Sequence, residues 1–267
     1  MLYELLSLAT ALLYSCSSIF TKKGLNRSNP STAILVSLIA NFLLICLFYL
    51  VNPVSQLNVD AILFFALGGI IASFIGRSAQ YISIEKIGVS VSSSVVGSSA
   101  LFSAFTATLL LHESFSSLIY LGIVLIIAGI ILLSQRRRGT SQTGWNKTDM
   151  IWSLGASICY GSSVTIRKMG LNITDNPIFG ATIGATASLS MYLLYLAASK
   201  RITPILSNLD RSSLLFFVFS GICTGLAWIL SYTATSAGPV TIVSALVSTY
   251  PLFSIILSYL FLREEIT

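Results

Sequence analysis

The sequence predicts an all-α polytopic membrane protein made of two inverted five-helix repeats, with nine of the ten helices present. Three observations predict this fold class. Of the 267 residues, 55% are hydrophobic and only 9% are charged, against about a quarter charged in a typical soluble domain. The few charges are separated by apolar runs long enough to cross roughly 30 Å of hydrocarbon as helices. The two halves of the chain also resemble each other.

Nine apolar runs are long enough for one crossing each. They cover residues 2–21, 32–51, 61–83, 89–111, 117–134, 150–167, 177–198, 213–235 and 240–262. The first run has no basic residue before it and is followed by Lys22 and Lys23, so we expect a membrane helix and not a removed signal peptide. The longest connection, 135–147, has three arginines followed by Gly, Ser and Thr, which is a linker composition.

The linker separates a first repeat over 1–139 from a second, incomplete repeat over 140–267. Residues 62–116 can be laid on 213–267 without a gap, and upstream segments also match. The aligned pairs include Phe65 with Phe216, Tyr81 with Tyr232, Ser93 with Ser244, Glu113 with Glu264, Tyr14 with Tyr160, and Lys22 with Lys168. Because the polar positions agree as well as the apolar ones, both halves are expected to descend from one unit.

An odd number of helices in the unit places the second copy in the membrane upside down relative to the first. Inverted repeats of this kind occur in transporters, where two similar halves exchange conformations around one central site. Residues 264–267 match the loop before 117–134, so a tenth helix is expected to be missing. A truncated form is the favoured explanation, and a nine-helix protein is the alternative. Gly122 and Gly129 share one helical face, as expected for close packing, including a contact between two copies in a homodimer.

The architecture, the aromatic-rich third helix ending near Tyr81 or Tyr232, and the segment from Pro251 to Glu264 resemble the EamA-type repeat of the drug/metabolite transporter superfamily. The first copy departs from the pattern, with Ala100 where the proline would be, although Glu113 is kept. The resemblance covers nearly the whole chain. It implies a ten-helix metabolite or drug carrier whose central cavity is lined by the first four helices of each half.

Arg77 is the leading candidate for contact with a solute. It lies in the third span with Ser73 and Tyr81 on the same helical face, and charges inside a bilayer are costly and usually serve a pathway. The alternative is that Arg77, about two turns from the helix end, extends to the lipid headgroups. Its repeat counterpart is Trp228, so an arginine in the cavity would favour a carboxylate or phosphate on one side of the site.

Other polar and aromatic side chains are further candidates for contact with a solute. They are Tyr14, Asn41, Gln80, Tyr81, Tyr160, Trp228, Tyr232 and Tyr250. For any one of them, a hydrogen bond between helices or an anchor at the membrane interface is the favoured explanation. Glu113 and Glu264 at helix ends are expected to be solvated or capping carboxylates.

The charge pattern conflicts over orientation. The resemblance implies a cytoplasmic N-terminus, but that orientation leaves mainly Arg167 and Lys168 inside and places most other basic loop residues outside. The positive-inside rule predicts the reverse. The excess of basic residues in these short loops favours an external N-terminus. The opposite orientation would exchange the two openings of the cavity without altering the cavity itself.

Several functional classes are disfavoured by the sequence. The basic residues form no stripe with interleaved aromatics, so nucleic acid is not an expected partner. The sole histidine, the absence of HExxH and GxSxG motifs, and cysteines without ligand spacing argue against an enzyme, a metal site or a cofactor. We expect a secondary carrier of small metabolites, amino acids or related organic anions, in the plasma membrane. A multidrug or cationic-compound exporter is the alternative, and a channel or a membrane scaffold is less favoured.

Overall fold

The computed structural model describes residues 1–51, 58–113, 121, 125, 147–199 and 210–262. Within these residues the regular structure is helical and contains no strand. The elements are α1 (Leu2–Leu25), α2 (Pro30–Val51), α3 (Val59–Gly69), the π-helix η1 (Ile70–Gly76), α4 (Arg77–Ile87), α5 (Val89–Val96), α6 (Ser99–Leu111), the short 3₁₀ helix η2 (Lys147–Asp149), α8 (Met150–Ile173), α9 (Pro177–Ala198), α11 (Arg211–Ala237), α12 (Val240–Val247) and α13 (Tyr250–Leu262).

Seven continuous helical stretches in the described part of the chain are long and apolar enough to cross a membrane. They are α1, α2, α9, α11, and the composite stretches α3–η1–α4, α5–α6 and α12–α13. The eighth long helix, α8, has 24 residues but is less apolar because it includes Arg167, Lys168 and several serines. Eight of the nine expected spans are therefore helices. The remaining span, 117–134, with Gly122 and Gly129, lies outside the described residues apart from Leu121 and Leu125, as do the linker to residue 146 and Glu264.

The helices expose many large apolar residues and bury many small polar ones, which is not the pattern of a soluble bundle. On α1, Leu2 and Leu5 are exposed while Ser7, Thr10 and Ser15 are fully buried. In lipid, apolar side chains gain nothing by leaving the surface, whereas small polar residues allow close helix contact and hydrogen bonds inside the bundle. The protein is therefore an integral, multi-pass membrane protein.

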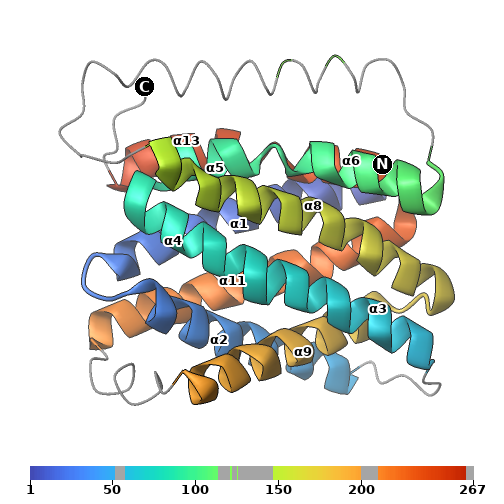
Figure 1. The fold of residues 1–267 in the computed structure, drawn as a ribbon, viewed down its shortest axis with the longest axis horizontal. Coiled ribbons are helices and arrows are strands. Elements are labelled where there is room, and N and C mark those ends of the chain that lie inside the picture. Colours follow the sequence, from blue (N-terminus) through green and yellow to red (C-terminus); the bar gives the residue numbers. More distant parts are fainter. Residues whose placement is uncertain (52–57, 114–120, 122–124, 126–146, 200–209, 263–267) are drawn as a thin grey trace.

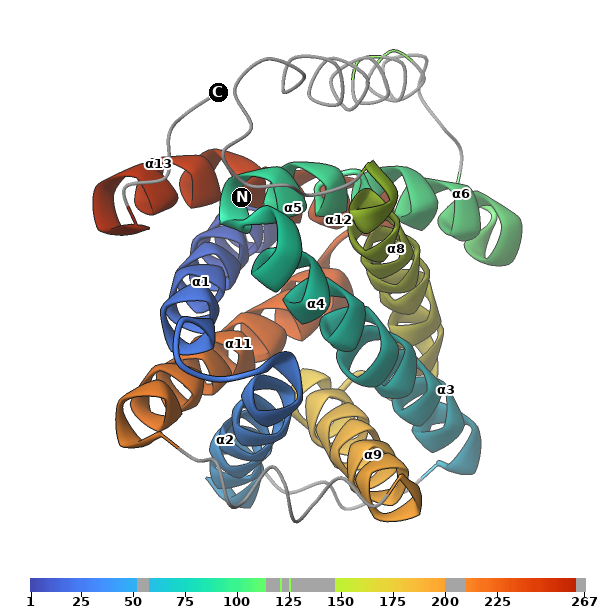
Figure 2. The ribbon, with the colours of Figure 1, turned by 60° about the vertical axis from the view of Figure 1, so that its left-hand side comes forward.

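The helices form one bundle in which segments from the two halves alternate. Figure 2 shows α5–α6 and α12–α13 along one edge of the bundle and α2 beside α9 at the opposite edge. Between them, α1 packs on α11, and α8 packs on α3 (Figure 1). The first helix of each half therefore packs on the third helix of the other half.

These contacts occur in matched pairs. A Cβ on Gly24 of α1 would lie 2.3 Å from Cε1 of Phe217, and a Cβ on Gly170 of α8 would lie 2.6 Å from Cε1 of Phe65. Similarly, the Lys22 amine donates to the Ile84 carbonyl at 3.1 Å. Lys168 donates to the Thr235 carbonyl at 2.7 Å. Each lysine thus caps the C-terminal end of the third helix of its own half.

The equivalent contacts in the structure differ by one residue from one pair of the gap-free sequence alignment. The gap-free alignment pairs Phe65 with Phe216, but the residue in the equivalent contact is Phe217. The reason is η1, since a π-helix accommodates one extra residue within a helix. Tyr81 follows Gly69 by 12 positions, whereas Tyr232 follows Gly221 by 11. After the insertion the register returns, so Arg77 and Trp228 remain counterparts.

Candidate solute-binding site

A cavity of about 80 Å³ lies between α1, α4, α8, α11 and the breaks in α5–α6 and α12–α13. At each break a nearly continuous helix stops and restarts, after Val96 and after Val247. A Cβ on Gly97 would lie 2.7 Å from Cγ of Pro251, so the glycine lets the two breaks approach each other closely. Ser99 and Ser248 from the two breaks both line the cavity. Broken helices at mid-membrane depth are tolerated where they line a cavity.

Arg77 begins α4, directly after the π-helix, and its side chain enters this cavity. The residue is 3% exposed, so it does not extend to the lipid headgroups. Its Nη2 donates to Oγ of Ser73 at 3.0 Å. Its Nη1 is buried without a hydrogen-bond partner in the described part of the protein. One side of the guanidinium is thus fixed by its own helix, and the other is available to a ligand.

Arg167 of α8 is a second arginine in the cavity wall, and it is 5% exposed. Its Nε donates to the Ser163 carbonyl at 3.2 Å. The guanidinium carbon lies 4.8 Å from the ring centroid of Tyr232 and 5.5 Å from that of Trp228. These aromatic faces stabilise a cation without neutralising it. As in Arg77, Nη1 has no partner among the described residues.

The sequence interpretation placed Arg167 at a span end and missed its role, because the predicted span stopped at residue 167. In the structure α8 continues to Ile173, which places Arg167 well inside the helix. Hydropathy carried no signal for it, because its aligned counterpart, Thr21, is also the last residue of a predicted span. In the structure Thr21 is buried as well, and Gly68 on α3 leaves room for the stem of Arg167, since a Cβ there would lie 2.8 Å from Cγ of Arg167.

Most of the other residues singled out from the sequence come together around the two arginines. Those that line the cavity are Tyr14, Gln80, Tyr81, Tyr160, Trp228 and Tyr250. The Tyr160 hydroxyl donates to Oε1 of Gln80 at 2.6 Å, joining α8 to α4. The Tyr81 hydroxyl lies 3.1 Å from Oγ of Ser220 on α11. These contacts connect the halves across the cavity, so the tyrosines both line the site and join its walls.

Asn41 and Tyr232 are not among the lining residues. Asn41 is fully buried where α2 packs on α11, and a Cβ on Gly225 would lie 3.2 Å from its Oδ1. Neither polar atom of its amide has a partner in the described residues. Tyr232 packs against Phe65, with 6.1 Å between ring centroids, and supports Arg167 from behind. Its contribution to the site is therefore indirect.

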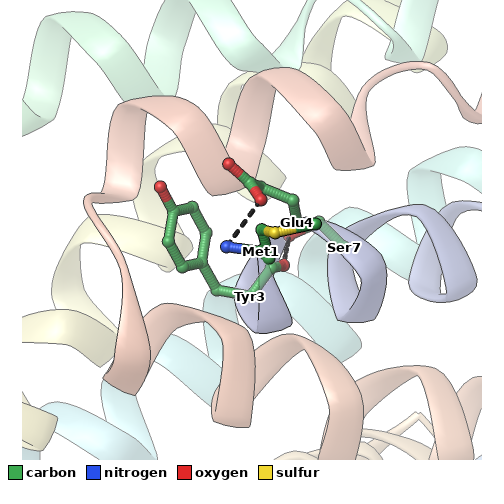
Figure 3. Close-up of polar contacts among 4 residues, drawn as sticks. All are labelled: Met1, Tyr3, Glu4 and Ser7. Atoms are coloured by element: carbon green, nitrogen blue, oxygen red, sulfur yellow. Dashed lines mark hydrogen bonds and ion pairs between the residues drawn. The ribbon is translucent and has the colours of Figure 1, made fainter.

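No aspartate or glutamate is found among the described residues that line the cavity. Glu4, at the outer turn of α1, has a side chain 43% exposed and is paired with the Met1 amine at 2.7 Å (Figure 3). Glu113 accepts from the backbone N–H of Val240 at 3.1 Å and of Thr241 at 3.2 Å, so it caps α12. Neither carboxylate faces the arginines, and the cavity carries net positive charge.

A helical bundle that exposes leucines, buries serines and encloses a charged cavity between two broken helices has the features of a polytopic membrane transport protein. The sequence model of the EamA-like transporter family matches residues 1–135 and 147–267. The chain therefore belongs to the EamA-like transporter family of the drug/metabolite transporter superfamily, as its sequence resemblance indicated.

Among solved structures, one described only as "Crystal structure of protein" is similar to this chain, with a TM-score of 0.74 at 15% sequence identity. The similarity covers 99% of this chain and 90% of that chain. At this identity the likeness establishes the shared fold alone. The comparison with curated proteins finds no match.

Proposed function

We propose that this protein is a secondary carrier that moves small organic anions across the plasma membrane by alternating access. The observation that carries the proposal is the pair Arg77 and Arg167, both buried in one cavity, each with an Nη1 that has no partner among the described residues. Buried charges in proteins are normally paired, because an uncompensated charge in a low-dielectric site costs several kcal/mol. An anionic solute supplies the missing partner, and guanidinium groups suit carboxylates and phosphates.

The sequence expectation named amino acids or related organic anions, and the geometry favours the second group. An amino acid also brings an ammonium group, which needs a carboxylate or a free aromatic face. The described lining has no carboxylate. The rings of Trp228 and Tyr232 are already contacted by Arg167. Tyrosine rings of the lining remain, but an ammonium group would enter a site that already holds two guanidinium charges and, among the described residues, no carboxylate.

The same features disfavour a multidrug or cation exporter. Lipophilic cations require an acidic or uncharged aromatic site, and this cavity contains two guanidinium groups. At about 80 Å³ it has room for roughly five to eight water molecules, taking about 10–15 Å³ for each. That is the size of a small metabolite. We propose no enzymatic activity for this protein.

Alternating access is proposed to rest on two inverted repeats, over 1–139 and 140–267. The matched contacts support it, since Gly24 with Phe217 corresponds to Gly170 with Phe65. Two halves with equivalent packing have two arrangements of comparable energy, one open to each side. The expected partners of the carrier are the lipids that surround it. A homodimer also remains a prediction.

The test is solute counterflow in proteoliposomes with a panel of organic anions, phosphorylated anions, amino acids, neutral sugars and cationic dyes. We expect exchange of small organic anions, reduced at least tenfold in Arg77→Gln and in Arg167→Gln, because each removes a charged hydrogen-bond donor. Arg211→Gln is the control, since it removes an exposed arginine outside the cavity. Exchange of cationic dyes that ignores both cavity arginines would overturn the proposal.

A further inference from the structure

The two cavity arginines lie at different depths along the same helix pair. A Cβ on Gly76, the residue before Arg77, would lie 3.2 Å from Cε1 of Tyr160. A Cβ on Gly68 would lie 2.8 Å from Cγ of Arg167. Arg77 therefore lies at the level of Tyr160, and Arg167 is seven positions further along α8. At 1.5 Å per residue the Cα atoms of the two arginines are roughly 10 Å apart along the helix axis.

Each guanidinium is also held by a different support. Arg77 is fixed by Ser73 on its own helix, whereas Arg167 is fixed by the Ser163 carbonyl and the rings of Trp228 and Tyr232. Ser73 and Ser163 each lie four residues before the arginine that they support. Because α3–α4 and α8 run antiparallel, with Gly68 beside Arg167 and Gly76 beside Tyr160, the two guanidinium groups turn toward each other within one cavity. A monoanion bound there compensates only one of the two buried positive charges.

We propose that the solute is a small dianion whose two negative charges compensate Arg77 and Arg167. The inference rests on the proposed function and specifies its substrate class. In the described part of the protein, two buried guanidinium groups each have an unpartnered Nη1 and no carboxylate lines the cavity. Two negative charges are therefore needed to compensate them. A dicarboxylate of about seven to nine non-hydrogen atoms also suits the cavity volume.

Trp228 provides a direct binding signal at this site. The protein has three tryptophans, and Trp228 is the one that contacts Arg167. Replacing Trp145 and Trp152 with phenylalanine leaves Trp228 as the single tryptophan, whose emission can be excited selectively over that of the tyrosines. Its emission is then titrated with dicarboxylates from oxalate to adipate, and with monocarboxylates of the same chain lengths.

We expect saturable changes in Trp228 emission, with dicarboxylates of malonate to glutarate length binding about 10- to 100-fold more tightly than monocarboxylates of equal length, as one additional charged contact allows. In Arg77→Gln and in Arg167→Gln this preference is lost, so that the dianion binds no more tightly than the monoanion. Arg211→Gln keeps the preference. The ratio of dicarboxylate affinity to monocarboxylate affinity is measured in a protein without cavity substitutions. It therefore tests the inference even where a variant fails to fold.

Equal affinity for matched monoanions and dianions in the parent protein would overturn the inference. So would a dianion preference that survives both cavity substitutions. If monoanions bind and exchange in an arginine-dependent way, the proposed anion carrier stands and only the dianion assignment fails. If no anion binds or exchanges, both fail.

Discussion

At the residue scale, small side chains determine how closely the helices approach. Gly69 of α3 packs directly on the backbone of α9, because a Cβ there would lie 2.3 Å from the Gly184 carbonyl oxygen and 2.4 Å from its Cα. Backbone atoms cannot rotate aside as a flexible side chain can. Gly155 of α8, in contrast, has no heavy atom of the described residues within 4 Å of such a Cβ.

The contrast gives a matched pair of substitutions. Gly69→Ala is expected to separate α3 from α9 and to destabilise the protein by about 1–3 kcal/mol, as overpacking does. Gly155→Ala is expected to be neutral or stabilising by up to about 1 kcal/mol, because alanine favours a helix over glycine. The apparent melting temperature in detergent measures both. Equal melting temperatures for the two variants would contradict the close α3–α9 contact.

At the element scale, the turn between α11 and α12 is held by residues from both halves. The Glu113 carboxylate, beyond the end of α6, accepts from two N–H groups at the start of α12 and from the Thr241 hydroxyl. Lys168 of α8 donates to the carbonyls of Thr235 and Ser236 at the end of α11. The sequence allowed Glu113 to be a solvated or a capping carboxylate, and the structure shows the cap.

Loss of this cap should loosen the turn. Glu113→Ala leaves two N–H groups of α12 without their acceptor and is expected to cost about 0.5–2 kcal/mol, as for other N-caps. The apparent melting temperature should fall by a few degrees. A cysteine introduced by Ser244→Cys, on the cavity side of α12, should also react faster with a membrane-impermeant thiol reagent.

Glu4→Ala is the control for Glu113→Ala, because Glu4 pairs only with the Met1 amine in the described structure. It should change neither the melting temperature nor the labelling rate. Unchanged labelling in Glu113→Ala would mean that the cap does not contribute to closure of the cavity.

At the scale of the whole molecule, the two broken helices meet across the boundary between the halves. Oγ of Ser99 lies 3.3 Å from Oγ of Ser248, and both residues line the cavity. If the halves move relative to each other during transport, this contact must open. A covalent link at this position therefore tests the motion itself.

The link can be made with Ser99→Cys and Ser248→Cys in a background where Cys16, Cys46, Cys159 and Cys223 are alanine. Oxidation is expected to stop counterflow, and reduction is expected to restore it. A link within the second half, Asp175→Cys with Ser236→Cys, is the control, since these side chains are hydrogen-bonded in one half. Full counterflow by the oxidised Ser99–Ser248 pair would argue against relative movement of the halves at this point.

Much of the fold follows from the sequence by itself. Apolar runs of membrane-spanning length predict the helices, because unsatisfied backbone groups are too costly in lipid for other structures. The position of α9 is predicted to the residue, from Pro177 to Ala198, since Asn176 and Pro177 form a strong helix start. Arg77 could be singled out because a charge inside a bilayer is unusual wherever it points.

Only the tertiary structure decided what the cavity contains. Arg167 lay at the expected end of its span, and hydropathy alone cannot place a helix end to within a turn. Asn41 and Arg77 are both polar residues inside spans, yet Asn41 lies between helices and Arg77 lines the cavity. Sequence gives the type and spacing of side chains along a helix. The direction that each side chain faces depends on how the helices pack and on the extra residue in the π-helix.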